Sequence, residues 1–215
     1  MMRKACEITA LETGPLSEEG LFRRWAERMP RLRREKIASL RNPEDRRLSL
    51  GAGILLLRAM ERRGLAAEKA EFGEGRYGKP FLTSCPEMHF SLSHAGSWAL
   101  CAVSDRPAGC DVERLGRGDR RIPGRFFHPE ERAALETAGD PAEWDRLFGR
   151  IWTRKESYLK ATGRGLSHAM AEFSVMSGPE EAWFDEKDLA EGYCFCCCVL
   201  GGPEPSFTWQ TETLE

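Results

Sequence analysis

The sequence predicts a mixed α/β protein. Two stretches, residues 42–63 and 142–161, have the apolar spacing of long amphipathic helices. Short apolar or alternating runs at 88–103 and 192–200 are typical of strands. With 215 residues, of which 41% are hydrophobic and 31% charged, the chain has an ordinary globular composition. That length fits one large domain or two small ones.

The first half is expected to open with a strand over residues 4–11. Ser17, followed by acidic residues, is expected to cap a helix that Pro30 ends. The next helix has a stronger start, because Asn42 can cap it and Pro43 suits the first helical position. We expect this helix to end near residue 63 and to bury a stripe made of Leu50, Ile54, Leu57 and Met60.

A glycine-rich loop over residues 73–80 comes next and ends in Tyr77-Gly78-Lys79-Pro80. Loops of this composition often lie close to a ligand, but many are only turns. Residues 88–103 then predict a hairpin with its turn at 95–97. His94, at that turn, is either structural or part of a site.

In the second half, residues 109–113 predict a strand and residues 114–125 a flexible basic loop. Pro129 is placed to open a helix, and the helix over 142–161 is expected to end at Thr162-Gly163. Closing strands are expected at 171–176, 192–200 and 207–211.

Bulk properties exclude several classes of protein. A net charge of −2 predicts no general attraction to nucleic acid. No run of 18 apolar residues indicates a transmembrane helix, and residues 1–7 have no apolar core of signal-peptide length. We therefore expect a cytoplasmic protein without a membrane or nucleic-acid partner.

Eight cysteines raise the question of disulfides or zinc. Cys194 and Cys197 have C-x-x-C spacing, but no second close Cys/His pair completes a tetrahedral site. The run from Tyr193 to Leu200 favours a buried strand in which cysteine acts as a small hydrophobe. Zinc binding by Cys194–Cys198 is the alternative.

Charged residues of opposite sign lie on the predicted helix over 142–161. Trp152, Glu156 and Lys160 recur every four residues, so they share one face. Glu156 and Lys160 are either an exposed ion pair or part of a site. Asp111 and Glu113 lie on one face of the predicted strand over 109–113, and two such carboxylates repel each other unless a cation or proton intervenes. Oxygen ligands of this kind suit magnesium.

Basic residues of the first half have two interpretations. Arg33 and Lys36 belong to a basic run over 31–36, and Arg47 lies near the start of the following helix. They form either a solvated helix face or contacts to a phosphate.

Four motifs occur in a characteristic order. They are Gly78-Lys79-Pro80, Phe90-Ser91-Leu92-Ser93-His94, Gly109-Cys110-Asp111-Val112-Glu113, and the stretch from Trp152 to Leu166 (W-T-R-K-E-S-Y-L-K-A-T-G-R-G-L). Over about residues 75–175 the chain resembles the Sfp-type 4′-phosphopantetheinyl transferases. The combination is specific, although each motif alone is weak.

The resemblance implies a fold and an activity. The fold is α/β (α+β), with two similar halves related by pseudo-twofold symmetry, each a small, mainly antiparallel sheet packed on a long helix. Residues 1–105 would form the half that binds the coenzyme A nucleotide, and residues 106–215 the half with the magnesium ligands and carrier docking. The implied reaction, of holo-[acyl-carrier-protein] synthase type, moves the phosphopantetheine arm of coenzyme A to a serine of an apo acyl or peptidyl carrier protein. It releases 3′,5′-ADP and is expected of a monomer.

The resemblance also implies site residues. Asp111, Glu113 and Glu156 would bind Mg²⁺, with Mn²⁺ as the alternative, and Glu156 and Lys160 would be catalytic. Coenzyme A contacts would come from Arg33, Lys36, Arg47, Lys79, Pro80, Ser93, His94 and Lys160. The spacing from the Arg33–Lys36 pair to Arg47 is one residue shorter than in the family. Position 48 is a leucine where a small hydroxyl residue is common in relatives, so one nucleotide contact is either lost or supplied by Ser49.

Carrier docking is expected on residues Arg117–Arg125 and on Phe126-Phe127. This basic segment is either a solvated loop or the contact for the acidic helices of a carrier domain. Two other functions remain open: a non-catalytic module that binds coenzyme A or a carrier, and a magnesium-dependent nucleotide pyrophosphatase.

Overall fold

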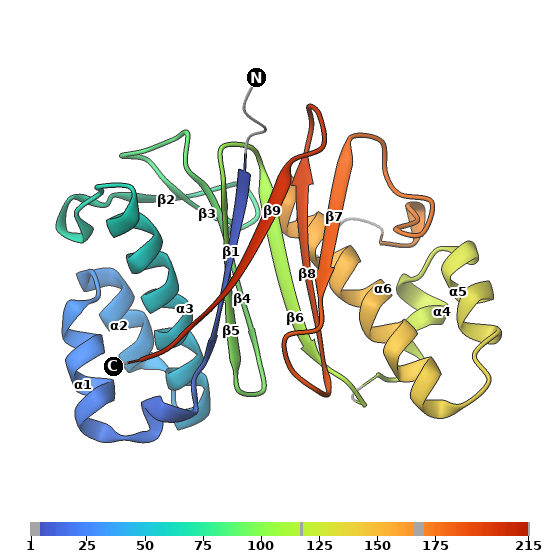
Figure 1. The fold of residues 1–215 in the computed structure, drawn as a ribbon, viewed down its shortest axis with the longest axis horizontal. Coiled ribbons are helices and arrows are strands. Elements are labelled where there is room, and N and C mark those ends of the chain that lie inside the picture. The colour runs from blue at the N-terminus through green and yellow to red at the C-terminus, as the bar shows by residue number, and fades with distance from the viewer. Residues whose placement is uncertain (1–4, 117, 166–169, 215) are drawn as a thin grey trace.

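Four layers follow one another across the molecule: helix α3 (Pro43–Arg62), a four-stranded sheet, a three-stranded sheet and helix α6 (Pro141–Thr162) (Figure 1). The structure, a computed structural model, describes residues 5–116, 118–165 and 170–214. The layers confirm the predicted α/β class with two similar halves, each a small, mainly antiparallel sheet packed on one long helix.

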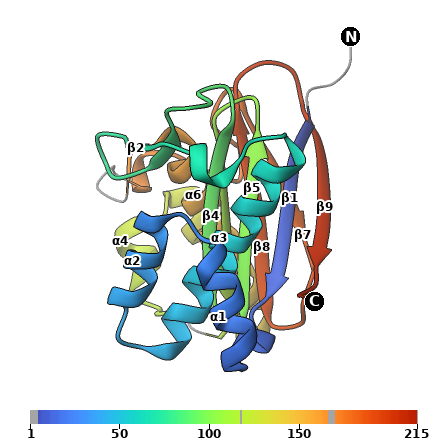
Figure 2. The same cartoon turned by 90° about the vertical axis from the view of Figure 1, so that its left-hand side faces the viewer.

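The first sheet has the strand order β4-β5-β1-β9. Its strands are β4 (His89–Ala95), β5 (Trp98–Ser104), β1 (Ala5–Glu12) and β9 (Ser206–Glu212). β1 pairs antiparallel with β5 and parallel with β9, so the end of the chain returns to the first half (Figure 2). The division of the chain into residues 1–105 and 106–215 stays a prediction. A separate short hairpin, β2 (Phe72–Glu74) and β3 (Pro80–Leu82), flanks this sheet.

The second sheet has the order β6-β8-β7, made of β6 (Ala108–Arg114), β8 (Tyr193–Leu200) and β7 (Ala182–Lys187). Both faces of β8 are buried. Cys197 lies in the apolar layer between the sheets, 3.6 Å from Cys6 between sulfur atoms, and Cys196 contacts Ser157 of α6. Burial on both faces explains the nearly continuous apolar run, and the predicted buried strand is confirmed.

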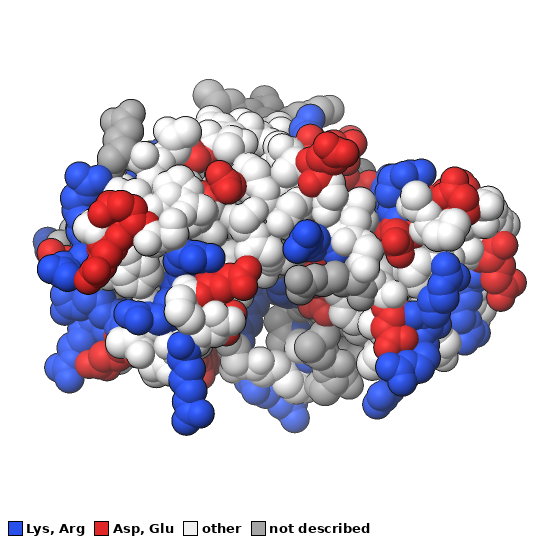
Figure 3. Space-filling model, turned by 90° about the horizontal axis from the view of Figure 1, so that it is seen from below, with Lys and Arg blue, Asp and Glu red and all other residues white. Residues whose placement is uncertain are grey.

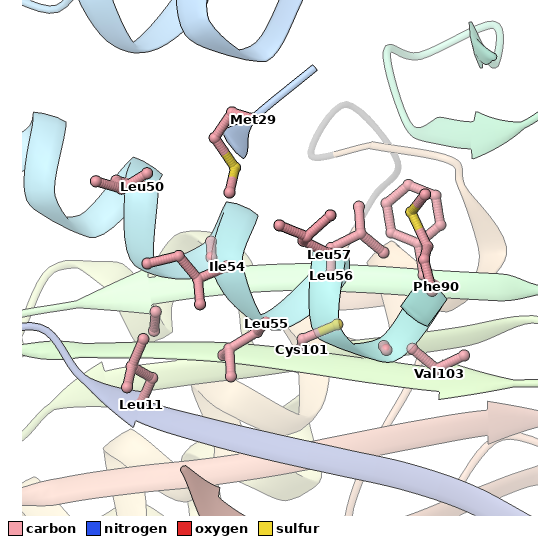
Figure 4. Packing of buried hydrophobic residues seen from close by; sticks show 14 of the residues in the cluster. Leu11, Met29, Leu50, Ile54, Leu55, Leu56, Leu57, Phe90, Cys101 and Val103 are labelled. Atoms are coloured by element: carbon pink, nitrogen blue, oxygen red, sulfur yellow. The ribbon is translucent and has the colours of Figure 1, made fainter. Parts of the chain in front are cut away.

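Helix α3 packs its apolar stripe on the first sheet. The predicted Leu50, Ile54, Leu57 and Met60 are all buried, and Figure 4 shows three of them near sheet residues such as Leu11 and Cys101. Both long helices begin and end where the sequence predicts. Asn42 accepts a hydrogen bond from the amide of Glu44, and Gly163 ends α6 with a φ of 66°, which glycine adopts without strain.

Smaller helices flank the two long ones (Figure 1). On the side of α3 are the 3₁₀ turns η1 (Gly14–Ser17) and η2 (Ala67–Lys69) and the helices α1 (Glu19–Arg28) and α2 (Arg31–Ser39). On the side of α6 are α4 (Ile122–Phe126), α5 (Pro129–Glu136) and the 3₁₀ turn η3 (Met170–Glu172).

Three local predictions are wrong. Glu18, not Ser17, caps α1, because its longer side chain reaches the amides of Gly20 and Leu21. The basic loop over 114–125 contains the start of α4, favoured by Pro123 in its first turn. Residues 171–176 form no strand, since η3 and a bend occupy them.

Three residues of the sequence predictions lie outside the described residues: Lys4, in the opening strand, Arg117, in the docking segment, and Leu166, at the end of the fourth motif. Among the helices of the described ranges, none combines the length and the apolar character needed to cross a membrane.

Candidate active site

A charged cluster lies where β4 of the first half meets β6 and α6 of the second. Lys160 donates hydrogen bonds from Nζ to Oδ1 of Asp111, at 2.6 Å, and to Oγ of Ser93, at 2.9 Å. Ser93 in turn donates to the same Asp111 oxygen at 2.7 Å. Asp111 is only 3% exposed. The structure therefore brings three predicted site residues from separate motifs into direct contact.

Glu156 faces the same cluster from one turn earlier in α6. Burial and the negative charges of Asp111 and Glu113 raise the pKa of its carboxyl to about 7, although Lys160 opposes the shift. Burial alone lowers the pKa of Lys160, but its contact with Asp111 brings the net pKa above the ordinary value. A carboxyl that titrates near neutrality beside a fixed ammonium is the arrangement expected for proton transfer.

The three carboxylates carry the signs of a cation site. Oδ2 of Asp111 is buried and has no hydrogen-bond partner among the described residues. The mutual repulsion that raises the pKa of Glu156 is what a bound cation relieves. Within the described ranges, however, the side chains do not form a group of three or more His, Cys, Asp or Glu ligands close enough to hold a metal ion. The donor set thus suits a magnesium ion, although the three carboxylates are not gathered into a coordination shell.

A cavity of about 370 Å³ opens beside the cluster. Glu156 and Lys160 line one side and the tip of the β2–β3 hairpin, including Lys79 and Pro80, the other. The ammonium of Lys79 donates to the backbone carbonyls of Ala108 and Ala161, at 3.0 and 3.2 Å. Burial lowers its pKa to about 8. In this structure Lys79 thus bonds to backbone of β6 and α6, in the second half.

The other predicted nucleotide contacts lie on the side of the first half. Arg33 and Lys36 line a neighbouring cavity of about 460 Å³, which shares Pro80 and Phe90 with the first one. Arg33 donates to the carbonyl oxygen of Ser49 at 2.7 Å. His94 is exposed by surface area, but desolvation of its ring lowers its pKa, and the cations of Lys160 and Arg33 lower it further. His94 therefore lies near enough to Lys160 and Arg33 to be affected by both charges.

Arg47 lies apart from these residues. Together with Arg46 it lines a third cavity, of about 570 Å³, between α1, α2 and the start of α3. Ser49, expected as one possible replacement for the missing hydroxyl contact, is buried in α3, and its role stays a prediction.

Two residues in or near the site were assigned no individual role from the sequence. Phe90 lines both cavities of the cleft, and Lys155 forms a buried ion pair with Glu131 behind Glu156. The alternation of β4 marks Phe90 as inward-facing. No local signal distinguishes Lys155 from an exposed lysine, because its partner comes from another helix.

The fold and cleft define a class of protein: an α/β protein of two similar halves, with a lysine ammonium and acidic side chains in the cleft between them. Comparison with known proteins agrees. A model of the 4′-phosphopantetheinyl transferase superfamily matches residues 107–198, which include the charged cluster except Ser93.

Curated relatives extend the match. A 4′-phosphopantetheinyl transferase of Bacillus subtilis is 38% identical over 144 residues, 66% of this chain and 64% of the relative. The transferase psf-1 of Bacillus pumilus is 31% identical over 79% of this chain and 74% of the relative. The transferase HetI of Nostoc is 31% identical over 79% of this chain and 76% of the relative.

The chain belongs to the 4′-phosphopantetheinyl transferase family. It nevertheless spans somewhat less than two thirds of the length of several of the curated relatives that it matches, at 64%, 60% and 64%.

Proposed function

We propose that the protein transfers the 4′-phosphopantetheine arm of coenzyme A to a serine of an apo acyl or peptidyl carrier protein and releases 3′,5′-ADP. The observation that carries the proposal is the contact of Lys160 with Asp111 and Ser93, which gathers residues of three motifs in one cleft between the halves. Membership of the family supports it independently.

Coenzyme A would occupy the two adjoining cavities of the cleft. Arg33 and Lys36 line one of these cavities and supply positive charge suited to the nucleotide phosphates, and His94, whose pKa is lowered, would supply a hydrogen-bond donor. Pro80 lines both cavities, whereas Lys79 and Lys160 line only the one beside the charged cluster. Arg47 would contribute to coenzyme A binding only through long-range electrostatic attraction, because it lines a separate cavity.

The magnesium ion would be held by Asp111, Glu113 and Glu156. A cation there would bind Oδ2 of Asp111, which has no hydrogen-bond partner among the described residues, and would offset the repulsion of Glu156 by the other two carboxylates. When bound, magnesium neutralises charge on the pyrophosphate of the substrate. Manganese, with the same preference for oxygen ligands, is the alternative.

The reaction would proceed by in-line attack. The carrier serine oxygen bonds to the β-phosphorus of coenzyme A, and the bond from that phosphorus to the bridging oxygen breaks, so that 3′,5′-ADP leaves with this oxygen. Glu156, whose carboxylate lines the cleft beside Lys160, would take the serine proton. Lys160 would stabilise the negative charge on the departing phosphate.

A carrier domain would dock beside α4. Residues 118–126 and α5 border a cavity of about 580 Å³ whose lining includes Arg120, Arg132 and Trp144. The guanidinium of Arg120 lies 4.5 Å from the ring centre of Trp144. In Figure 3, the flank over α4–α5 carries basic side chains interspersed with acidic ones. The lining also includes Glu136 and Asp140, so Arg120, Arg132 and the ring of Trp144 would supply the contacts to an acidic amphipathic helix.

Location and oligomeric state belong to the proposal as well. The eight buried, unpaired cysteines fit a reducing compartment such as the cytoplasm. A monomer suffices, because both halves of the cleft come from one chain.

The release of 3′,5′-ADP from coenzyme A tests the function. The protein would be incubated with coenzyme A and magnesium, with and without an excess of apo carrier. We expect release that depends on the carrier and is lost in Asp111→Ala. Release without a carrier would favour the nucleotide pyrophosphatase. Tight binding of coenzyme A without release on any carrier would favour the non-catalytic module.

A further inference from the structure

A completely buried ion pair lies behind the charged cleft. Nζ of Lys155, in α6, is 2.9 Å from Oε2 of Glu131, in α5, and both side chains are 0% exposed. Lys155 is the residue before Glu156, yet the pair does not line the cleft. Its role therefore has to be inferred from what it holds together.

The polar groups of the pair are fully used. Lys155 donates to the backbone carbonyls of Met170 and Phe173, both at 2.7 Å, in addition to Glu131. An ammonium has three donors, so none is left over. Glu131 accepts from the amide of Val175 at 2.8 Å and from the amide of His128 at 2.8 Å. One pair thus joins α6, the start of α5, the η3 turn and residues 173–175.

Such a pair is weak evidence for stability, because removing two ions from water costs about as much as their attraction returns. What it specifies is geometry. In α6, Lys155 and Glu156 point about 100° apart around the helix axis. Fixing the direction of Lys155 therefore fixes the direction in which Glu156 and, one turn later, Lys160 project.

A second contact holds α6 from the sheet side. At Gly109 of β6, an added Cβ would lie 1.9 Å from the carbonyl oxygen of Ser157, so the helix backbone rests directly on the strand. Ser157 also contacts Cys196 of β8. With the sheet on one side and the Lys155–Glu131 pair on another, α6 has little freedom to rotate, and the face with Glu156 is left towards the cleft.

The side of α6 that carries Lys155 also meets the α4–α5 junction. Phe127, completely buried just before α5, stacks on Phe148 and Trp152 of α6, with ring centres 5.4 and 6.3 Å apart. Glu131 binds the amide of His128, the next residue after Phe127. The ion pair therefore connects the catalytic helix to the segment on which carrier docking is proposed.

We propose that Glu131 and Lys155 are positioning residues: the pair locks α6 to the α4–α5 junction and to residues 170–175, and so holds Glu156 and Lys160 in register with a docked carrier serine. This inference rests on the proposed function for its kinetic part. Its structural part, the locking of α6, can be measured without any substrate.

The test uses the double variant Glu131→Gln and Lys155→Met in the full chain. It removes both charges together, so that no buried ion is left without a partner, and the introduced carboxamide keeps an acceptor for a backbone amide. The matched control is Arg150→Met with Glu186→Gln, which removes another ion pair of α6, at 2.7 Å, whose side chains are 60% and 26% exposed.

For the double variant we expect kcat for transfer to a carrier to fall about tenfold to a hundredfold, because small displacements of catalytic groups cost rates of this order. The dissociation constant for coenzyme A should stay within about twofold, since the pair lies outside the cleft cavities. The control variant should keep the wild-type kcat and the wild-type dissociation constant for coenzyme A. An unchanged kcat, or an equal loss of kcat and coenzyme A affinity, would overturn the proposal.

Hydrogen exchange of backbone amides gives the readout that needs no activity. In the double variant the amides of the second half of α6 and of residues 173–175 should exchange at least about tenfold faster than in the wild type and the control. Unchanged exchange would contradict the locking. If the wild type transfers nothing to any carrier, the proposed function fails, and exchange alone decides whether the pair locks α6.

Should the double variant not fold, Glu131→Asp replaces it. This change keeps both charges and draws the carboxylate back by one methylene. A folded Glu131→Asp protein should show the same selective loss of kcat, and a wild-type kcat there would overturn the proposal.

Discussion

Nζ of Lys160, on α6, lies 2.6 Å from Oδ1 of Asp111, on β6, and both groups bond to the hydroxyl of Ser93, on β4. The three residues come from motifs as far as 67 positions apart and from both halves of the molecule. Their contact places one fixed positive charge at the junction of the halves, where the negative charges of Asp111 and Glu156 also converge.

Replacing this charge should abolish most of the activity. In Lys160→Met, we expect transfer in a single turnover to fall by about 10²- to 10³-fold, because the developing charge loses a preorganised partner. The buried Asp111 carboxylate also loses a donor, so the free energy of unfolding should fall by about 1–3 kcal/mol. Rapid-quench kinetics and urea unfolding measure the two effects. Lys69→Met, at an exposed position, is the control, and a wild-type rate in Lys160→Met would remove Lys160 from the mechanism.

Glu156 should make stability depend on pH. Its folded-state pKa of about 7 lies above the ordinary 4.5. The native state therefore holds this proton while the unfolded state has lost it, and stability falls as the pH rises between the two values. With a chelator present, Glu156→Gln should be more stable than the wild type by roughly 1–3 kcal/mol at pH 8, with only a small gain at pH 5.

Urea unfolding at both pH values checks this expectation, and an equal difference at pH 5 and pH 8 would mean that Glu156 is not the titrating group. The same variant should lose turnover at saturating magnesium if Glu156 is the base. Near-normal turnover would assign that role elsewhere.

Magnesium should stabilise the folded protein even without substrate. A ligand that binds only the native state adds RT ln(1 + [L]/Kd) to the free energy of unfolding, about 2.7 kcal/mol at a hundredfold excess over Kd. We expect the melting temperature to rise with magnesium in the wild type and to stay constant in Asp111→Asn. Calorimetric scans across a magnesium series make the comparison. A magnesium effect of the same size in both proteins would place any ion outside these carboxylates.

Reversing charge beside α4 should weaken docking of the carrier. For Arg120→Glu with Arg121→Glu we expect KM for an acidic carrier to rise about tenfold or more at low salt, with the affinity for coenzyme A unchanged. Arg121 already bonds to Asp119 at 2.7 Å, so most of the effect should come from Arg120. Arg23→Glu with Arg24→Glu, on α1 of the opposite flank, is the control. An unchanged carrier KM would move the docking site off this segment.

Much of the fold could be predicted because its signals are local. Asn42 and Gly163 mark ends of the long helices through caps that need only neighbouring residues, and the alternation of Asp111 and Glu113 identifies their strand. The conformation of residues 171–176 could not be predicted from local signals. The carbonyls of Met170 and Phe173 bond to the distant Lys155 rather than to a neighbouring strand, and this depends on tertiary contact.

The candidate site shows the same division. Motif order indicated Ser93, Asp111 and Lys160, which the fold does bring together. Spacing could not show that Arg47 faces a cavity between α1 and α2, nor that Lys79 turns towards backbone carbonyls of the second half. The direction in which these side chains point is set by the packing of helices and strands that are distant in the sequence.

Intact-protein mass spectrometry of the carrier detects the proposed transfer itself. The protein would be mixed with coenzyme A, magnesium and each of a panel of apo carrier domains, alongside an Asp111→Ala variant and a reaction without magnesium. If the protein carries out the proposed transfer, at least one carrier should gain the mass of a single phosphopantetheine arm, and both controls should leave it unchanged. A panel of carriers that all keep their apo mass, while the protein still binds coenzyme A, would contradict the proposed transfer.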